Sequence, residues 1–361
     1  MRNVKNLKKS SKRWMRSQIL LKTLILTLIA CPTISLFAEY GKGCDPCMPI
    51  CDQCDSCCEW QFHGDWLYWK VRRSDLDYAI PKTTQESFQA NGRIECVGFD
   101  RDSGFRVGGY RNCNGNWNFG LRFTHYETIA KSSVHSEQNI FYPTRPHRAA
   151  QSFDLMVFGG NFAASQYELD LNILDFEAGY KYNLSYCKAF ARPLVGIKFA
   201  FIDQKMVSDY EGDQFTDELK IQTSEKIDMD SYGVYLGLEG EWNIWCGFGI
   251  FGRLSGGFNF GNIDVRHVDI GTREMDTQLV DDVKGSVCLL VRNYEFSTGI
   301  QWELCDYLCA DWMIQFGYEF HDWCGIIDFL NFTDISEFGK TTRGGSNLGY
   351  DGIFIRLNAK Y

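Results

Sequence analysis

Hydrophobic and polar residues alternate through the last ten positions of the chain. Ile353, Ile355, Leu357, Ala359 and Tyr361 are apolar, and most of the residues between them are polar or charged. Successive side chains of a β-strand point to opposite faces, so the pattern predicts a strand with one apolar and one charged face. Such a strand suits either the surface of a soluble sheet or the closing strand of an outer-membrane β-barrel, whose apolar face contacts lipid. The aromatic residue at the last position favours the barrel.

Nine segments upstream repeat this alternation: 60–68, 104–110, 117–124, 167–184, 195–201, 231–242, 248–260, 294–304 and 312–321. Short polar connections alternate with longer polar segments, which we predict to be the loops 130–150, 204–229, 263–285 and 322–346. The apolar phase shifts between Ile173 and Leu174, which predicts a β-bulge. Segments 75–80, 93–99, 151–162 and 280–290 leave room for further strands. We therefore predict an all-β fold, a transmembrane antiparallel β-barrel of 10 to 14 strands with both ends on the periplasmic side.

The first 38 residues have the features of an export signal. Residues 1–22 carry eight Lys and Arg residues and no acid, an apolar run follows at 23–30, and Ala38 is a small residue suited to cleavage. This order predicts a secretory signal peptide over residues 1–38. The apolar run is too short for a transmembrane helix. In an alternative interpretation, the Leu-Ile-Ala-Cys sequence at 28–31 is a lipoprotein signal, and Cys31 becomes a lipidated first residue.

A cysteine-rich segment, residues 39–59, precedes the predicted barrel, residues 60–361. It holds Cys44, Cys47, Cys51, Cys54, Cys57 and Cys58. Their spacing would suit zinc or an iron–sulfur cluster in a cytosolic protein. An exported chain enters an oxidising compartment, where disulfides are the default, and a metal site is the alternative. Because the segment has no apolar periodicity, we predict a periplasmic extension that bridges to neighbouring molecules.

Other cysteines lie near the ends of the predicted strands. Those at or beside the short connections, which we place on the periplasmic side, are Cys113, Cys187, Cys246, Cys305 and Cys309. Cys96, Cys288 and Cys324 lie near the opposite end. The alternative is that these residues are small buried hydrophobic side chains. Their position at turns favours a disulfide network on the periplasmic side.

Charge and composition narrow the partners. Removal of residues 1–38 leaves 29 basic against 46 acidic residues, a formal charge of −17. An acidic exported chain is a poor nucleic-acid binder. The 10 Trp, 18 Tyr and 27 Phe residues suit the aromatic girdles of a barrel at the two lipid interfaces. We expect contact with outer-membrane lipid, and no nucleic acid, metal or cofactor.

An enzyme barrel with Asp/His or Ser/His sets at its rim is the main rival hypothesis. The six histidines are scattered over strands and loops: His63, His125, His135, His147, His267 and His321. None lies in a Gly-x-Ser-x-Gly, His-Glu-x-x-His or phosphate-binding-loop setting. We therefore expect no enzymatic activity.

Several blocks resemble the Legionella-type and chlamydial-like major outer membrane proteins. They are Trp-Leu-Tyr-Trp-Lys at 66–70, Asp-Leu-Asp-Tyr-Ala at 75–79, Gly-Phe-Arg-Val-Gly at 104–108 and Leu-Asp-Leu-Asn at 169–172 with Asp175. The resemblance spans most of the mature chain. It implies a pore-forming outer-membrane barrel, and its cysteine-rich relatives imply an envelope stiffened by disulfides. The C-terminal pattern of Ile353, Ile355, Leu357, Ala359 and Tyr361 also resembles the signal that the barrel-assembly machinery recognises.

We predict a porin-like channel for passive diffusion of small solutes that is also a disulfide-linked structural component of the envelope. A homotrimer would suit such a porin. The candidate pore-lining residues are Asn118, Arg122, Lys198, Glu239, Glu241, Gln301, Glu303, Gln315 and Glu319. A ten-stranded barrel has little free lumen, which is the main physical objection. The alternative is a closed structural or adhesive barrel whose outer loops contact a host or a neighbouring molecule.

Overall fold

The computed structural model describes residues 59–81, 92–113, 116–135, 141–146, 160–184, 189–214, 217–245, 247–273, 276–307, 310–327, 329, 331–332, 341–342 and 345–361. They belong to one compact unit, Asp55–Tyr361. Every regular element in them is a β-strand. None of these residues forms a helix that is long and apolar enough to cross a lipid bilayer. The predicted signal peptide, with Cys31, and the cysteines at 44–58 lie outside the described residues.

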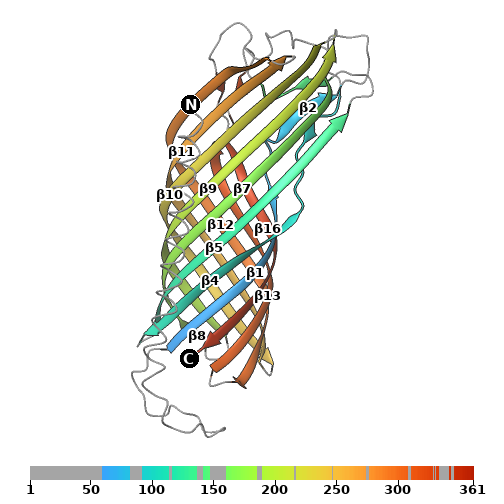
Figure 1. Cartoon of the computed structure of the whole chain (residues 1–361). Helices are drawn as coiled ribbons and strands as arrows, with labels where there is room; N and C mark the ends of the chain where they lie inside the picture. Colours follow the sequence, from blue (N-terminus) through green and yellow to red (C-terminus); the bar gives the residue numbers. More distant parts are fainter. Residues whose placement is uncertain are drawn as a thin grey trace, which may run out of the picture. The chain divides into compact units, whose positions relative to one another are not determined.

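Ten long strands form the barrel (Figure 1). Their bounds are β1 Glu59–Arg72, β4 Arg101–Cys113, β5 Trp117–His135, β7 Gly160–Tyr180, β9 Ala189–Gln214, β10 Asp217–Trp245, β11 Phe248–Arg273, β12 Asp276–Tyr307, β13 Ala310–Ile327 and β16 Gly345–Lys360. Each strand pairs antiparallel with its neighbours, and β16 returns to β1 through a register that begins at Gln61 opposite Lys360. The short β8 (Tyr182–Leu184) adds to β9. Closure satisfies both edges of the sheet and confirms ten barrel strands, the lower limit of the prediction.

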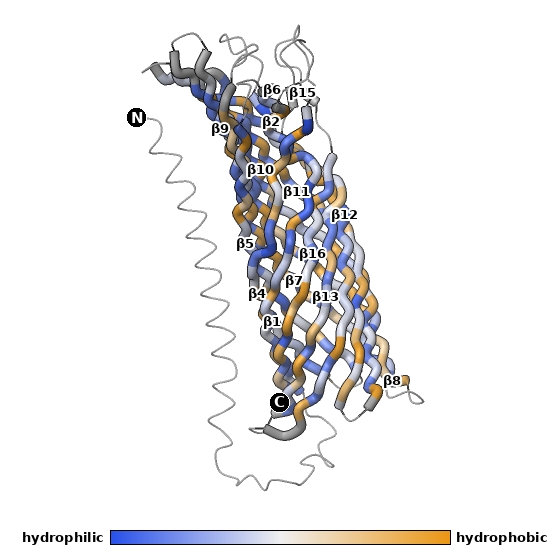
Figure 2. The backbone as a smooth tube through the Cα atoms, turned by 90° about the vertical axis from the view of Figure 1, so that its right-hand side faces the viewer, coloured by the Kyte–Doolittle hydropathy of each residue, from blue (hydrophilic) through white to orange (hydrophobic). Residues whose placement is uncertain are grey.

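The outer surface carries an apolar belt bounded by aromatic residues. One row of exposed aromatic residues contains Trp60, Trp117, Tyr182, Trp242, Trp302 and Tyr361, and the other contains Tyr68, Phe105, Phe201, Tyr232, Phe260, Tyr294 and Phe320. Hydrophobic and hydrophilic positions alternate along the strands (Figure 2). From Trp60 to Tyr68, eight residue steps along a tilted strand span roughly 20 Å, close to the apolar band of outer-membrane barrels. We assign this belt to the lipid bilayer.

Polarity inverts where the strands leave the belt. Within it, β7 turns Phe176 outward and the buried carboxylates Asp175 and Glu177 inward. Beyond it, the same strand buries Leu169 and Leu171, and its outward positions are polar. Water surrounds the barrel above the belt, so polar residues face outward there and apolar residues fill the interior.

This inversion corrects the predicted β-bulge at Ile173 and Leu174. The register between β5 and β7 is continuous there, from Trp117 opposite Tyr180 to His135 opposite Phe162. Ile173 faces inward in the water-surrounded part, and Leu174 faces outward in the belt. The apolar phase shifts because the solvent changes, and the backbone keeps its pleat.

Several predicted loops are also strands. The segments 204–229 and 263–285 form the upper parts of β9, β10, β11 and β12, and β5 reaches into the segment 130–150. The predicted loop 322–346 contains the end of β13 and the start of β16, with two short strands, β14 (Asn331–Phe332) and β15 (Thr341–Thr342), between them. These strands were not predicted because their outward residues are polar, whereas the predicted strands were recognised by an apolar outer face.

The possible extra strands do not enlarge the barrel. Segments 75–80 and 93–99 contain β2 (Asp77–Pro81) and β3 (Glu95–Cys96), which form a separate small sheet with β6 (Phe141–Pro143). Segment 280–290 belongs to β12, and residues 160–162 begin β7. β2 lies at the end of the barrel opposite the C-terminus (Figure 1). The short connections and Tyr361 mark the periplasmic end, so this small sheet is on the extracellular side.

Candidate channel interior

Charged side chains fill the barrel at the level of the belt. They form a network of six carboxylates (Asp65, Asp175, Glu177, Glu239, Glu295 and Glu319) and six cations (Arg106, Arg122, Arg192, Lys198, Arg253 and Arg356). The formal charges cancel. Buried charges are tolerated when each is paired and hydrogen-bonded.

The first part of the network joins β5, β7, β9 and β12. Arg122 donates to Asp175 at 2.7 Å and to Glu295 at 3.0 Å. Lys198 donates to Glu295 and lies 3.5 Å from Asp175. All four side chains are at least nine-tenths buried. Two cations and two carboxylates therefore close a neutral cluster across the interior.

The second part is built around Arg106 on β4. Its guanidinium donates to Asp65 at 3.0 Å and to Glu319 at 3.1 Å. Asp65 also accepts two hydrogen bonds from Arg356 at 2.8 Å, which links β1 to the closing strand β16. Trp69 donates its indole N–H to Glu319 at 2.9 Å. These contacts fix the seam at which the first and last strands meet.

The third part lies nearer the periplasmic end and centres on Glu177. Its carboxylate accepts hydrogen bonds from Arg253 at 2.7 Å, Arg192 at 2.9 Å and the Tyr235 hydroxyl at 3.1 Å. Arg192 also reaches Glu239 at 2.6 Å. A Cβ atom at Gly179 would lie 2.5 Å from Arg192 Nε, so the missing side chain makes room for the arginine to cross the interior.

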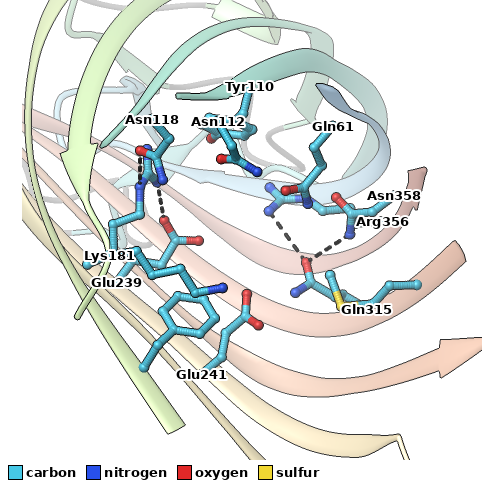
Figure 3. A pocket seen from close by; sticks show the side chains of 13 residues that line it. Gln61, Tyr110, Asn112, Asn118, Lys181, Glu239, Glu241, Gln315, Arg356 and Asn358 are labelled. Atoms are coloured by element: carbon cyan, nitrogen blue, oxygen red, sulfur yellow. Dashed lines mark hydrogen bonds and ion pairs between the residues drawn. The ribbon is translucent and has the colours of Figure 1, made fainter. Parts of the chain in front are cut away.

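Below this network the interior opens toward the periplasm. A cavity of about 620 Å³ is lined by Gln61, Asn112, Lys181, Glu241 and Glu303, among others. Figure 3 shows the smaller cavity of about 80 Å³ that shares part of its lining, with Arg356, Asn358 and Gln315 on one side and Asn118 and Glu239 on the other. Polar side chains converge there from opposite walls. The periplasmic vestibule therefore narrows toward the ion-pair network.

Above the network an apolar block continues the filling. Trp69, Tyr126, Trp323 and Tyr350 are at most 1% exposed and belong to one hydrophobic cluster. The Trp69 ring lies 4.7 Å from the Tyr350 ring and 5.3 Å from the Tyr126 ring, centre to centre. These buried aromatic rings pack against one another inside the barrel.

The extracellular end is tied together by Arg145. Its guanidinium donates to the backbone oxygens of Asp75 and Asp77 and lies 3.7 Å from Glu225 on β10. It also stacks over the ring of Phe329, 5.7 Å from the ring centre. One side chain therefore links segments that follow three different barrel strands to the barrel wall.

His267 forms a buried acid–histidine cluster that shares Glu225 with Arg145. Its ring nitrogens lie 3.3 Å from Glu225 and 3.1 Å from Asp269, and Thr223 donates to Asp269 at 2.7 Å. Burial alone would lower the pKa of His267, but the hydrogen bonds to Asp269 and Glu225 outweigh it and raise the pKa to about 9. The ring is 0% exposed, so a substrate in solution does not reach it in this conformation.

The pore-lining candidates lie at different depths of the interior. Asn118, Arg122, Lys198, Gln301, Gln315 and Glu319 are buried. Glu239, Glu241 and Glu303 lie near the periplasmic cavities. Only some are brought together: Arg122 and Lys198 share Glu295, and Gln301 accepts from Gln315 at 3.0 Å. Their role in lining a pore stays a prediction.

The sequence pattern predicted four of the twelve network residues, Arg122, Lys198, Glu239 and Glu319, and missed the other eight. It did not select Asp65, Arg106, Asp175, Glu177, Arg192, Arg253, Glu295 or Arg356 as lumen residues. A signal was present, because Arg106 shares its alternation phase with Gly108 and Tyr110, the face opposite to the outward-facing Phe105. In each strand of the belt, the residues between the outward apolar positions face inward. Assigning every charged residue at those positions to the interior would have identified this set.

Cys96, Cys113, Cys288 and Cys324 carry free thiols. Cys113 ends β4 at the rim of the periplasmic cavity, whereas Cys96, Cys288 and Cys324 lie on the extracellular side. Cys305 lies near the C-terminal end of β12. Cys187, Cys246 and Cys309 fall outside the described residues. The predicted periplasmic disulfide network stays a prediction.

In the predicted assembly signal, Ile353, Ile355, Leu357 and Ala359 alternate along β16, Ala359 is buried, and Tyr361 follows the end of the strand. Ile355, Leu357 and Tyr361 are between 41% and 61% exposed, toward the lipid side. Tyr361 exchanges two backbone hydrogen bonds with Trp60, at 3.0 and 2.8 Å. The last residue therefore completes the seam of the barrel, while recognition by the assembly machinery stays a prediction.

Comparison with known proteins gives a family and distant likenesses. The solved structures include the outer membrane protease OmpT from Escherichia coli, with 9% identity, a TM-score of 0.42, and coverage of 84% of this chain and 96% of that one. A Pseudomonas aeruginosa FadL homologue has 7% identity, a TM-score of 0.27, and coverage of 84% and 90%. Likeness at these levels supports no inference about activity. No curated protein matches.

The family match covers most of the chain. The family described as Legionella pneumophila major outer membrane protein precursor matches residues 54–361, which include all ten barrel strands. The apolar belt and the closed antiparallel barrel agree with that description. The chain belongs to this family of major outer membrane proteins and is an outer-membrane β-barrel.

Proposed function

We propose that this protein is a structural outer-membrane barrel that is closed at rest and displays a folded cap, the small sheet of β2, β3 and β6, on the extracellular side. The observation that carries the proposal is the neutral ion-pair network across the barrel at the level of the belt. Solute passage would require these pairs to separate. Leaving one buried charge unpaired costs about 3–5 kcal/mol, and the network contains many such pairs.

The apolar block supports the same proposal. Trp69, Tyr126, Trp323 and Tyr350 lie directly above the ion pairs and exclude water from the path to the extracellular side. A solute would therefore meet two different barriers in sequence, one charged and one apolar. The barrel is too narrow for both to move aside without a change of the strands themselves.

A diffusion channel is the second candidate, as the resemblance implies. The periplasmic vestibule of about 620 Å³ and the polar interior at the belt favour it. In that case the ion pairs act as a gate. The equal numbers of acidic and basic side chains in the network predict little preference between anions and cations, which reversal potentials in a salt gradient would check.

Planar-bilayer conductance of the refolded mature protein separates the two candidates. We expect no conductance steps from protein that circular dichroism shows to be folded and that floats with lipid vesicles. Discrete conductance steps would establish the channel and refute the closed barrel. A parallel recording with a thiol reductant tests the cysteines, because steps that appear only on reduction would mean that disulfides hold the channel shut.

Envelope partners follow from the same proposal. We infer that the periplasmic cysteines link the barrel to other envelope proteins, that the extracellular strands and cap contact a host or a neighbouring molecule, and that the signal peptide directs export. The proposal includes no enzymatic activity, and a homotrimer remains a prediction. Cross-linking of intact cells followed by mass spectrometry measures both the disulfide partners and the oligomeric state.

A further inference from the structure

Three cations gather on the outer wall of the barrel where β1 ends and β4 begins. Lys70 lies opposite Arg101 on β4 and opposite Asp351 on β16, and Arg72 follows Lys70 by two residues on β1. The strands β1 and β4 run side by side in the barrel wall (Figure 1). All three cations have the outward parity of their strands. We call Lys70, Arg72 and Arg101 the basic patch.

Lys70 and Arg101 bring two like charges face to face. Directly opposite side chains of neighbouring strands have Cβ atoms about 4.5–5.5 Å apart, and like charges there destabilise a sheet. The carboxylate opposite Lys70, Asp351, is already engaged, because it accepts hydrogen bonds from Arg72 and from the Tyr318 hydroxyl. Among the described residues, neither Lys70 nor Arg101 forms an ion pair with a carboxylate. The fold therefore keeps two cations together without an anion of its own between them.

The basic patch is at the height of the lipid headgroups. Tyr68 and Phe105 belong to the extracellular aromatic row of the belt. Lys70 follows Tyr68 by two residues and so lies roughly 5 Å higher along a tilted strand. The headgroup layer on each side of a bilayer is roughly 5–8 Å deep. An anion held by the patch would thus lie directly above the acyl chains that the aromatic side chains contact.

Four cations elsewhere on the outer wall are paired. Each lies between 2.7 and 3.7 Å from a carboxylate, and they are Lys205, Lys226, Arg266 and Lys284 on β9 to β12. These four strands continue far above the belt into water, whereas β1 ends at Arg72 and β4 begins at Arg101. The contrast separates cations that have protein partners in water from two that lack them at the lipid boundary.

We propose that the basic patch binds the phosphate of an outer-leaflet lipid with an anionic headgroup. The guanidinium of arginine presents a planar fork of N–H donors that matches phosphate oxygens, and lysine adds a compact charge. A phosphate between Lys70 and Arg101 would replace their repulsion by charge-assisted hydrogen bonds on both sides. The belt below the patch would accept the acyl chains of the same molecule, a contact that a soluble phosphate cannot make. This site does not depend on whether the barrel conducts.

The test is lipid binding to the mature chain refolded in a neutral detergent. Native mass spectrometry measures the dissociation constant of the first bound lipid, for lipid A, a phosphorylated glycolipid, and for phosphatidylcholine, whose headgroup has no net charge. Three forms are compared: the unmodified chain, the patch variant Lys70→Gln with Arg101→Gln, and the matched control Lys205→Gln with Arg266→Gln. Both variants lose one lysine and one arginine from the outer wall. Migration of unheated protein in a detergent gel verifies that each form is a folded barrel.

We expect the unmodified chain and the control to bind lipid A roughly tenfold more tightly than the patch variant, since each cation at a membrane surface adds to the attraction of anionic lipid. Phosphatidylcholine should not distinguish the three forms. Equal affinity of all forms for lipid A, or equal losses in both variants, would overturn the proposal. Displacement of lipid A by inorganic phosphate would assign the patch to a soluble anion and also overturn it.

Thermal unfolding in vesicles supplies a second readout. In phosphatidylcholine the patch variant should unfold at the same temperature as the unmodified chain or at a higher one, because the repulsion between Lys70 and Arg101 is gone. With lipid A in the vesicles the order should reverse, since a ligand stabilises the form that binds it. A patch variant that loses the same stability in both membranes would show a structural role and overturn the proposal. If the patch variant does not fold, the single variants Lys70→Gln and Arg101→Gln decide by the same comparison.

Discussion

Replacing Glu177 by glutamine tests the buried network directly. Its side chain is fully buried and lies 2.7 Å from Arg253 and 2.9 Å from Arg192. At an effective dielectric constant of about 20, two unit charges at 2.7 Å attract by roughly 6 kcal/mol. Desolvation offsets part of this attraction, and loss of one partner of a buried pair costs about 3–5 kcal/mol. We expect Glu177→Gln to lower the free energy of unfolding by that amount.

A double-mutant cycle with Arg253→Met separates the ion pair from other effects. The double variant removes both partners, so the two single costs should exceed its cost by about 1–3 kcal/mol. Urea unfolding in phospholipid vesicles, followed by tryptophan fluorescence, measures each free energy. Glu211→Gln is the matched control, because Glu211 pairs with Lys220 at 3.1 Å on the exposed surface and should cost about 1 kcal/mol or less. Additive costs at Glu177 and Arg253, within about 0.5 kcal/mol, would refute the pairing.

Three further predictions test the two solvents of the barrel and its seam. Leu236→Lys places a charge in the apolar belt and should cost about 2–4 kcal/mol in vesicle unfolding, whereas Gln222→Lys, on the same strand above the belt, should cost little. The raised pKa of His267, about 9 against 6.5, stabilises the folded state fully below pH 6.5 and loses its effect as the pH rises through 9. The melting temperature should therefore fall as the pH rises across that window, and His267→Asn should remove this pH dependence. Tyr361→Ser should reduce barrel assembly in cells, measured as the folded fraction in outer membranes, and leave refolding in detergent largely intact.

The strand positions could be predicted because lipid enforces a strict alternation. Each barrel strand includes a stretch in which every second residue is apolar, as in Tyr232 to Leu238 of β10. A one-residue slip would turn this whole set inward, so the pattern is unambiguous. The upper strands could not be found by the same rule, because Asp228 and Lys226 face water there and Met229 and Ile227 are buried.

The sequence predicted which face of a strand some residues of the candidate site occupy, but not which residues contact each other. Alternation placed Arg122 and Lys198 inside, and the structure confirms that both are buried. It could not show that both reach Glu295, which is 173 residues from Arg122 along the chain. That contact depends on barrel closure and diameter. Charges that the sequence placed toward a water-filled lumen are therefore ion-pair partners across the barrel interior.

The inversion of polarity gives the proposed closed interior its physical basis. In the belt, lipid accepts the apolar side chains, so the polar ones must turn inward and can be stabilised only by one another. Above the belt, water accepts the polar side chains, so Ile202, Met229 and Ile263 turn inward and build an ordinary apolar core. In a ten-stranded barrel each inward set is large enough to fill the space. One alternating sequence therefore produces two stacked cores of opposite polarity, and a channel would have to pass through both.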